Sequence, residues 1–146
     1  MTQRTLLAMA ILATLTGPAL AQTASPIGLW RTVDDHTGTE RGLVRISEAN
    51  GVLYGRVEKI FDPVEAAKAC VKCTDDRKDK PILGLDILRG LKPEGDGWGG
   101  GQIVDPQTGS VYSASARVTD GGKHLILRGY LLISLLGRSQ TWTREP

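Results

Sequence analysis

The chain has 146 residues, with 18 Lys and Arg against 16 Asp and Glu and a formal net charge of +2. This length is sufficient for one domain with a single hydrophobic core. The near balance of charge argues against binding to nucleic acid, because that role needs a dense basic surface that displaces counterions.

The first 21 residues have the parts of a secretory signal peptide in the right order. Arg4 supplies a positive charge, residues 6–15 form an apolar run, and a Gly-Pro pair precedes a small-x-small site that ends at Ala21. An apolar run of about ten residues forms a helix of about 15 Å, whereas the hydrocarbon core of a bilayer is about 30 Å thick. We therefore expect cleavage after Ala21 rather than an uncleaved anchor or a buried core helix. The expected mature domain spans residues 22–146 and is periplasmic or secreted.

Beyond the signal, short strand-like segments alternate with turn signals such as Asn50-Gly51. Apolar residues that alternate or run together predict strands over residues 28–33, 40–47, 52–61, 98–104, 111–118, 124–133 and 138–144. Most of the connections are short enough for hairpins. This pattern predicts an all-β fold, a single antiparallel meander of about eight strands that closes into a barrel.

One long irregular region interrupts the pattern between Asp62 and Asp96. Residues 63–69 are the best helix candidate, because a proline suits the first turn. Residues 86–91 are compatible with a short helix or with a strand. We expect this region to be a short helical or irregular insertion between strands.

Cys70 and Cys73 form a Cys-x-x-Cys pair, and both follow the expected cleavage site. In an oxidising compartment such a pair is predicted to be a disulfide. A redox dithiol would need a thiolate at a helix N-terminus, whereas the expected helix precedes Cys70. A zinc site would need two further ligands, and neither His36 nor His124 has a suitable spacing. The disulfide is the favoured interpretation, with a redox site and a metal site as alternatives.

The sequence contains none of the motifs typical of nucleophilic, metal or phosphate chemistry. No Gly-x-Ser-x-Gly, His-Glu-x-x-His or glycine-rich phosphate loop is present. His36 follows Asp34 and Asp35, but side chains that cap the backbone explain a turn this rich in Asp, Thr and Gly. We therefore predict a protein that is not an enzyme and that uses no cofactor and no metal.

The first and last predicted strands carry a specific pair of motifs. Gly28-Leu-Trp30 begins the first strand, and Trp142-Thr-Arg144 ends the last. Lipocalin-like barrels use a similar arrangement, in which an arginine of the closing strand stacks on the indole of a Gly-x-Trp motif and seals one end. The resemblance implies that Gly28, Trp30 and Arg144 close the barrel. Alternatively, Trp30 and Trp142 are ordinary core aromatics.

Strand alternation points to a pocket inside the barrel. Arg138 and Trp142 share one face of the last strand, and Arg128 and Tyr130 share one face of the strand before it. An apolar lining with a few arginines and tyrosines suits a small hydrophobic or amphipathic ligand. The candidate pocket residues are Tyr54, Trp98, Tyr112, Arg128, Tyr130, Arg138 and Trp142. Arginines that point outward into solvent are an equal alternative.

Motifs along nearly the whole expected mature chain form a specific combination. They are Gly28-Leu-Trp30, Asn50-Gly51 with Leu53-Tyr-Gly55, Pro81-Ile-Leu-Gly84, Gly101-Gln-Ile-Val-Asp105-Pro, Arg128-Gly-Tyr130 and Gly137-Arg-Ser-Gln-Thr-Trp142. In this order they resemble the bacterial family called domain of unknown function 2147. The resemblance implies a lipocalin-like (calycin) barrel in a periplasmic or secreted protein of Gram-negative bacteria. It implies no catalytic residue.

These observations together predict an exported, non-catalytic protein, monomeric or weakly associating, that binds a small hydrophobic or amphipathic molecule inside its barrel. This function requires an interior cavity. The alternative is a cell-envelope module whose outer surface, including the apolar residues 131–136, contacts a partner protein or a membrane surface. A filled barrel with an exposed apolar patch favours that alternative. A redox or metal protein that uses Cys70 and Cys73 is a third possibility.

Overall fold

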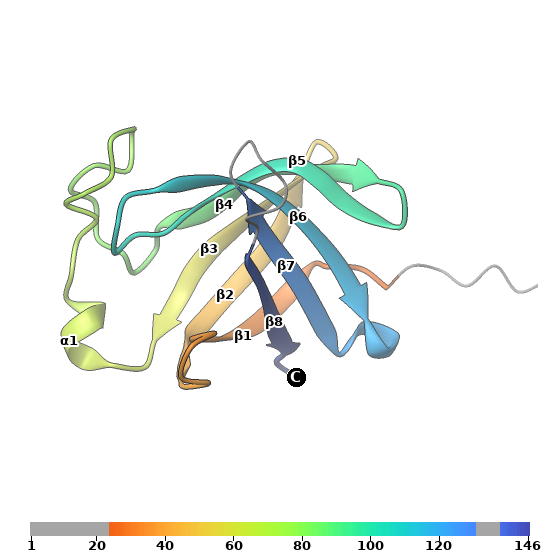
Figure 1. Ribbon diagram of the computed structural model, residues 1–146, viewed down its shortest axis with the longest axis horizontal. Coiled ribbons are helices and arrows are strands. Elements are labelled where there is room, and N and C mark those ends of the chain that lie inside the picture. Colours follow the sequence, from red (N-terminus) through yellow and green to blue (C-terminus); the bar gives the residue numbers. More distant parts are fainter. Residues whose placement is uncertain (1–23, 131–137) are drawn as a thin grey trace, which may run out of the picture.

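The computed structural model describes residues 24–130 and 138–146. In these residues the strands form one closed antiparallel barrel in sequence order, with β8 pairing back onto β1 (Figure 1). The strands are β1 (Gly28–Val33), β2 (Glu40–Ala49), β3 (Val52–Ile60), β4 (Asp86–Glu94), β5 (Gly97–Val104), β6 (Val111–Thr119), β7 (His124–Tyr130) and β8 (Arg138–Arg144). The predicted all-β barrel is confirmed. The predicted signal peptide and the apolar residues 131–136 lie outside the described residues.

Local sequence explains the tight hairpin between β2 and β3. Asn50 and Gly51 have φ angles of 54° and 76°. A two-residue type I′ turn needs positive φ at both positions, and its twist matches that of the flanking strands. The Asn-Gly pair thereby sets the register in which Ala49 lies opposite Val52.

The β3–β4 connection is the predicted insertion, which lies at one side of the barrel (Figure 1). It begins with α1 (Pro63–Ala66), whose N-cap Asp62 accepts hydrogen bonds from the backbone N–H groups of Val64 and Glu65. The helix is shorter than the predicted residues 63–69, because the chain leaves helical geometry after Ala67 and pairs Ala69 with Pro81 in an isolated bridge.

Residues 86–94 form a full strand, β4, although the sequence had left 86–91 as helix or strand and 62–96 as irregular. Gly90 has a φ of 79°, and β4 shifts register twice against β3. These bulges place the buried Leu88 and Leu91 three residues apart instead of two. The expected alternation is lost in the sequence, so the strand pattern was not recognisable.

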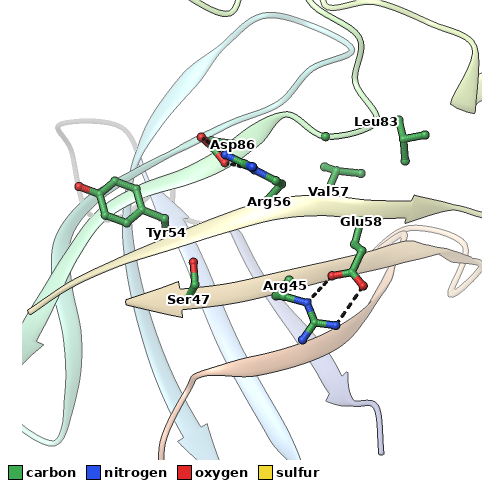
Figure 2. A pocket seen from close by; sticks show the side chains of 9 residues that line it. Arg45, Ser47, Tyr54, Arg56, Val57, Glu58, Leu83 and Asp86 are labelled. Carbon is green, nitrogen blue, oxygen red and sulfur yellow. Dashed lines mark hydrogen bonds and ion pairs between the residues drawn. The ribbon is translucent and has the colours of Figure 1, made fainter. Parts of the chain in front are cut away.

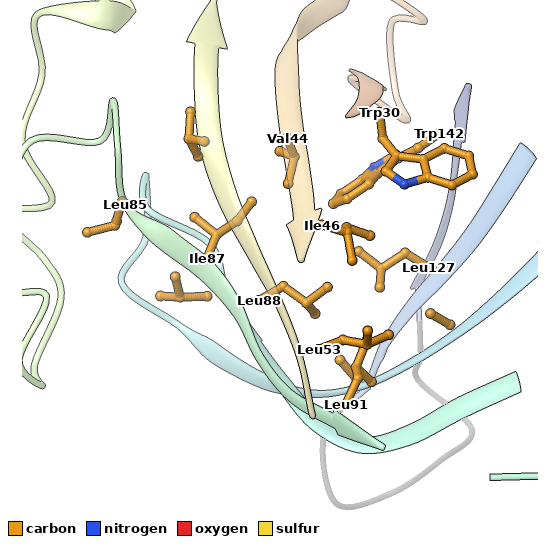
Figure 3. Close-up of a cluster of buried hydrophobic side chains, with 14 of the residues drawn as sticks. Trp30, Val44, Ile46, Leu53, Leu85, Ile87, Leu88, Leu91, Leu127 and Trp142 are labelled. Atoms are coloured by element: carbon orange, nitrogen blue, oxygen red, sulfur yellow. The ribbon is translucent and has the colours of Figure 1, made fainter. Parts of the chain in front are cut away.

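The barrel interior is packed with large apolar side chains (Figure 3). Inward positions of neighbouring strands face each other in register, as Trp30 faces Val44 and Leu125 faces Trp142. The central residues are at most 3% exposed, and they are Trp30, Val44, Ile46, Leu53, Leu88, Leu91, Ala114, Leu125, Leu127 and Trp142. Such packing stabilises the barrel.

Arg144 of β8 lies over the ring of Trp30 of β1, its register partner. The guanidinium carbon of Arg144 lies 4.2 Å from the centroid of the Trp30 ring, and the indole N–H donates to the Pro26 carbonyl over 2.8 Å. Arg144 also donates to three backbone carbonyls, those of Ser25, Ile27 and Gly122. Gly28 beside it has a φ of 143°, a conformation that side chains disfavour, and a Cβ there would lie 2.5 Å from Nη1 of Arg144.

Candidate functional site

A groove lies on the outside of the barrel, over β2 and β3, and has a volume of about 590 Å³ (Figure 2). We call it the outer groove. Its lining residues are Arg45, Ser47, Tyr54, Arg56, Val57, Glu58, Leu83, Gly84 and Asp86. A volume of this size is in the usual range for a small-molecule site.

The hairpin of β2 and β3 provides one wall of the outer groove through simple strand alternation. Arg45 lies opposite Arg56 and Ser47 lies opposite Tyr54, and all four point away from the barrel interior. The residues between them are buried, as Ile46 is at 1% exposure. The same alternation therefore builds the core and the outer groove.

The end of the insertion provides the other wall. The N–H of Gly84 donates to the Val57 carbonyl over 2.8 Å, and the N–H of Val57 donates to the Leu85 carbonyl over 2.9 Å. This short ladder attaches the wall to β3. Leu83, next to it, is 46% exposed and presents an apolar side chain at the groove.

Two ion pairs line the outer groove. Arg45 binds both carboxylate oxygens of Glu58, and Arg56 binds both oxygens of Asp86 over 2.8 and 3.1 Å. The hydrogen bond from its arginine is the main cause that lowers the pKa of each carboxyl below its ordinary value. The four groups are therefore charged at neutral pH.

A buried arginine anchors the insertion next to the groove. Arg77 is only 2% exposed, forms an ion pair with Asp75 and donates to the backbone carbonyl of Asp86 over 3.2 Å. Asp86 is also the partner of Arg56. Arg77 thus connects the interior of the insertion to a residue that lines the groove.

The sulfur atoms of Cys70 and Cys73 lie at disulfide-bonding distance, as predicted. Both cysteines are buried, at 0% and 2% exposure. The N–H of Cys70 donates to the Lys80 carbonyl, and the N–H of Asp79 donates to the Cys70 carbonyl. The disulfide therefore closes a tight turn, and the backbone hydrogen bonds of Cys70 attach this turn to residues 79–80 of the insertion.

The predicted pocket residues do not converge on one site. Trp142 is buried in the core, where its indole N–H donates to Gln140, and Trp98 is half-buried against the same core. Tyr112 is half-buried on β6. Tyr54 is 36% exposed and lies in the outer groove.

The remaining candidates lie near the junction of β7 and β8. Arg128 is exposed and Tyr130 is half-buried, and both alternate with the inward Leu127 and Gly129, so they point outward. Arg138, at the start of β8, is exposed and bound to the carboxylate of Asp35. Contact of any of these residues with a ligand remains a prediction.

Both histidines contact polar side chains, and Nε2 of His36 lies 2.9 Å from Nη2 of Arg138 on β8. The side chain of Asp34 accepts from the backbone N–H of His36, which is the capping expected of this turn, and His124 pairs with Asp120 over 2.6 Å. Among residues 24–130 and 138–146, no group of three or more His, Cys, Asp or Glu side chains is placed to hold a metal. Within the same ranges, no helix has the length and apolar character that crossing a bilayer requires.

The sequence had singled out only Tyr54 among the residues of the outer groove. The available signal was the polar alternation on both sides of Asn50-Gly51, which places Arg45 and Ser47 on one strand and Tyr54 and Arg56 on the next. The contribution of Leu83 and Asp86 depends on the path of the insertion. That path could not be read from periodicity.

Comparison with known proteins agrees with the fold. A solved structure described as "Protein HP1028 from the human pathogen Helicobacter pylori belongs to the lipocalin family" matches with a TM-score of 0.73 and 20% identity over 85% of each chain. This likeness shows a lipocalin-like fold. No curated protein matches the sequence. The family described as "Uncharacterized protein conserved in bacteria (DUF2147)" matches residues 28–144, and the chain belongs to this family.

Proposed function

We propose that this protein is exported and binds a small amphipathic molecule in the outer groove. The observation that carries the proposal is the position and lining of the outer groove. The groove of about 590 Å³ lies on the outer face of β2 and β3, whereas the central residues of the barrel are packed against each other. The binding site expected from the sequence is thereby moved from the inside of the barrel to its outer wall.

The lining of the groove suits a ligand with one apolar and one polar part. Leu83 and the ring of Tyr54 offer exposed apolar surface. The hydroxyl groups of Ser47 and Tyr54 have no hydrogen-bond partner among the described residues. Apolar contacts would provide most of the affinity, and the hydroxyls would orient the ligand.

The role is binding rather than catalysis. The charged groups of the groove are Arg45, Arg56, Glu58 and Asp86, and each carboxylate is already engaged by an arginine. A carboxylate held in this way has a lowered pKa and is a poor general base at neutral pH. A lipocalin-like fold is consistent with a small-molecule ligand.

Native mass spectrometry of protein purified from its own periplasm tests the proposal. We expect a bound small molecule on the wild-type protein, and its loss in Tyr54→Ala and in Leu83→Ser. Val64→Ser is the matched control, because Val64 is 70% exposed on α1 and does not line the groove. A molecule retained in both groove variants would contradict the proposed site, and its absence from wild type would contradict the function.

A second candidate function is contact with an envelope partner through the insertion. Val64, Val71 and Leu83 are 70%, 58% and 46% exposed, so three large apolar side chains of this segment are open to solvent. A photo-crosslinking residue at Val71 should then join one defined protein in the envelope, and the same residue at Arg117 on β6 should not. Equal labelling at both positions would contradict this function.

A further inference from the structure

Two arginines face each other across neighbouring strands in the outer groove. Arg45 of β2 and Arg56 of β3 are direct register partners. Side chains in such positions have Cβ atoms about 5 Å apart, and like charges there are destabilising. Each arginine forms an ion pair with a separate carboxylate, Arg45 with Glu58 and Arg56 with Asp86. Figure 2 shows these two ion pairs on opposite sides of β3.

Each guanidinium is only partly used. The carboxylate binds Nε and Nη2 of its arginine in both pairs. Nη1 of Arg45 and Nη1 of Arg56 have no partner among the described residues. The side chains are 51% and 64% exposed, so a ligand in the groove can reach their guanidinium groups.

The unused polar groups of the groove are therefore mostly donors. They are the two Nη1 groups and the hydroxyls of Ser47 and Tyr54. In both ion pairs the arginine side chain is more exposed than its carboxylate, at 51% against 43% and 64% against 28%, so a ligand reaches the donors more readily than the acceptors. Donors that lack acceptors match an anionic group, and N–H groups of arginine bind carboxylate and phosphate oxygens strongly.

We infer that the polar part of the groove's ligand is an anion, a carboxylate or a phosphate ester, bound by Nη1 of Arg45 and Nη1 of Arg56. This inference rests on the proposed function. The apolar part of the ligand lies against Leu83, which Figure 2 shows at the opposite end of the site from Tyr54. The net charge of the two ion pairs is zero, so the affinity for the anion comes from directed hydrogen bonds and falls only moderately with salt.

Probes of one chain length and different head groups test the inference. Octanoate, octyl phosphate, octanol and octyltrimethylammonium are titrated into the full mature protein by calorimetry, with acetate and inorganic phosphate as head groups without a chain. We expect octanoate and octyl phosphate to bind at least tenfold more tightly than octanol, and the cation to bind no better than octanol. Arg45→Gln and Arg56→Gln should each weaken octyl phosphate about tenfold, which is the loss of about one charge-assisted hydrogen bond.

Arg117→Gln is the matched control, because Arg117 is an exposed arginine of β6 that does not line the groove. Its ion pair with Asp96 is long, at 3.7 Å. Its affinity for octyl phosphate should equal that of wild type. If octanol binds as tightly as octanoate, the inference of an anionic head group is wrong and the proposed function still stands. If inorganic phosphate binds as tightly as octyl phosphate, the ligand needs no apolar part and the proposal of an amphipathic ligand is wrong. If no probe binds, both the anionic head group and the proposed function are contradicted.

Discussion

Replacement of Arg144 by lysine tests how the barrel is closed. Arg144→Lys keeps the positive charge but removes the planar group that lies 4.2 Å from the centroid of the Trp30 ring. It also removes the fork of donors that binds three backbone carbonyls, at 2.6 Å, 2.9 Å and 2.5 Å. A lysine ammonium is a compact charge on a flexible stem and cannot reproduce this geometry.

The expected destabilisation follows from these contacts. Loss of the stacked guanidinium costs about 0.5–1 kcal/mol at a partly exposed site. A lysine keeps one of the three hydrogen bonds at most, and each lost bond costs about 0.5–1.5 kcal/mol, with the lower value for the exposed ones. We expect the free energy of unfolding to fall by about 2 kcal/mol, which lowers the melting temperature by about 5–10 °C for a domain of this size.

Urea unfolding followed by far-UV circular dichroism measures the loss. Tryptophan fluorescence is unsuitable as the only probe, because the substitution changes the environment of Trp30. Arg117→Lys is the control, and it should change the free energy of unfolding by less than about 0.5 kcal/mol. If Arg144→Lys is as stable as this control, the stacked arginine does not close the barrel in the way that its contacts indicate.

Two further substitutions test the insertion and its contacts. Asp75→Asn should cost about 2 kcal/mol at pH 7, because it leaves the buried Arg77 without its carboxylate, although Asp75 itself is partly exposed. The hydrogen bond from Arg77 is the main cause that lowers the pKa of Asp75 from 3.8, so the stabilisation is complete at neutral pH and is lost as the pH falls below about 4. Urea unfolding should therefore show a smaller difference in the free energy of unfolding between wild type and Asp75→Asn at pH 3 than at pH 7. A difference that stays constant would contradict the pairing. Gly109→Ala should lower the free energy of unfolding, measured by thermal unfolding, by more than about 2 kcal/mol, because the new Cβ would lie 2.0 Å from the Lys72 carbonyl oxygen of the insertion. Gly38→Ala is the control, because Gly38 has a similar positive φ but open space around it, and it should lower that free energy by about 1 kcal/mol. Equal losses of stability in Gly109→Ala and Gly38→Ala would show that the insertion does not pack against the turn at Gly109.

Much of the barrel was predictable because its strands obey simple alternation. β1 and β8 have the predicted bounds, and β2, β3, β5 and β6 differ from prediction by one or two residues at an end. The face of β6 that carries Ala114 and Ala116 is buried. β4 was not recognisable, since its bulges disturb the period of two and it contains Pro93, a residue that strands disfavour.

The site was less predictable, because a sequence does not say which face of a strand points inward. Arg128 and Tyr130 share a face with the apolar Ile126, which made that face look internal, yet Leu125 and Leu127 fill the barrel. Which face is buried depends on the pairing of distant strands and on the volume left inside a closed barrel. The wall around Leu83 depends further on the insertion, whose path is set by specific hydrogen bonds rather than by a repeating pattern.

The location of the ligand is the central claim, and a titration of the ¹⁵N-labelled protein with octyl phosphate tests it most directly by NMR. The account predicts that the backbone amide signals of Tyr54 and Gly84 shift progressively on addition of the ligand. The indole N–H signals of Trp30 and Trp142, which report on the barrel interior, should stay in place. Shifts of the two indole signals without shifts of the groove amides would contradict the account and return the ligand to the inside of the barrel.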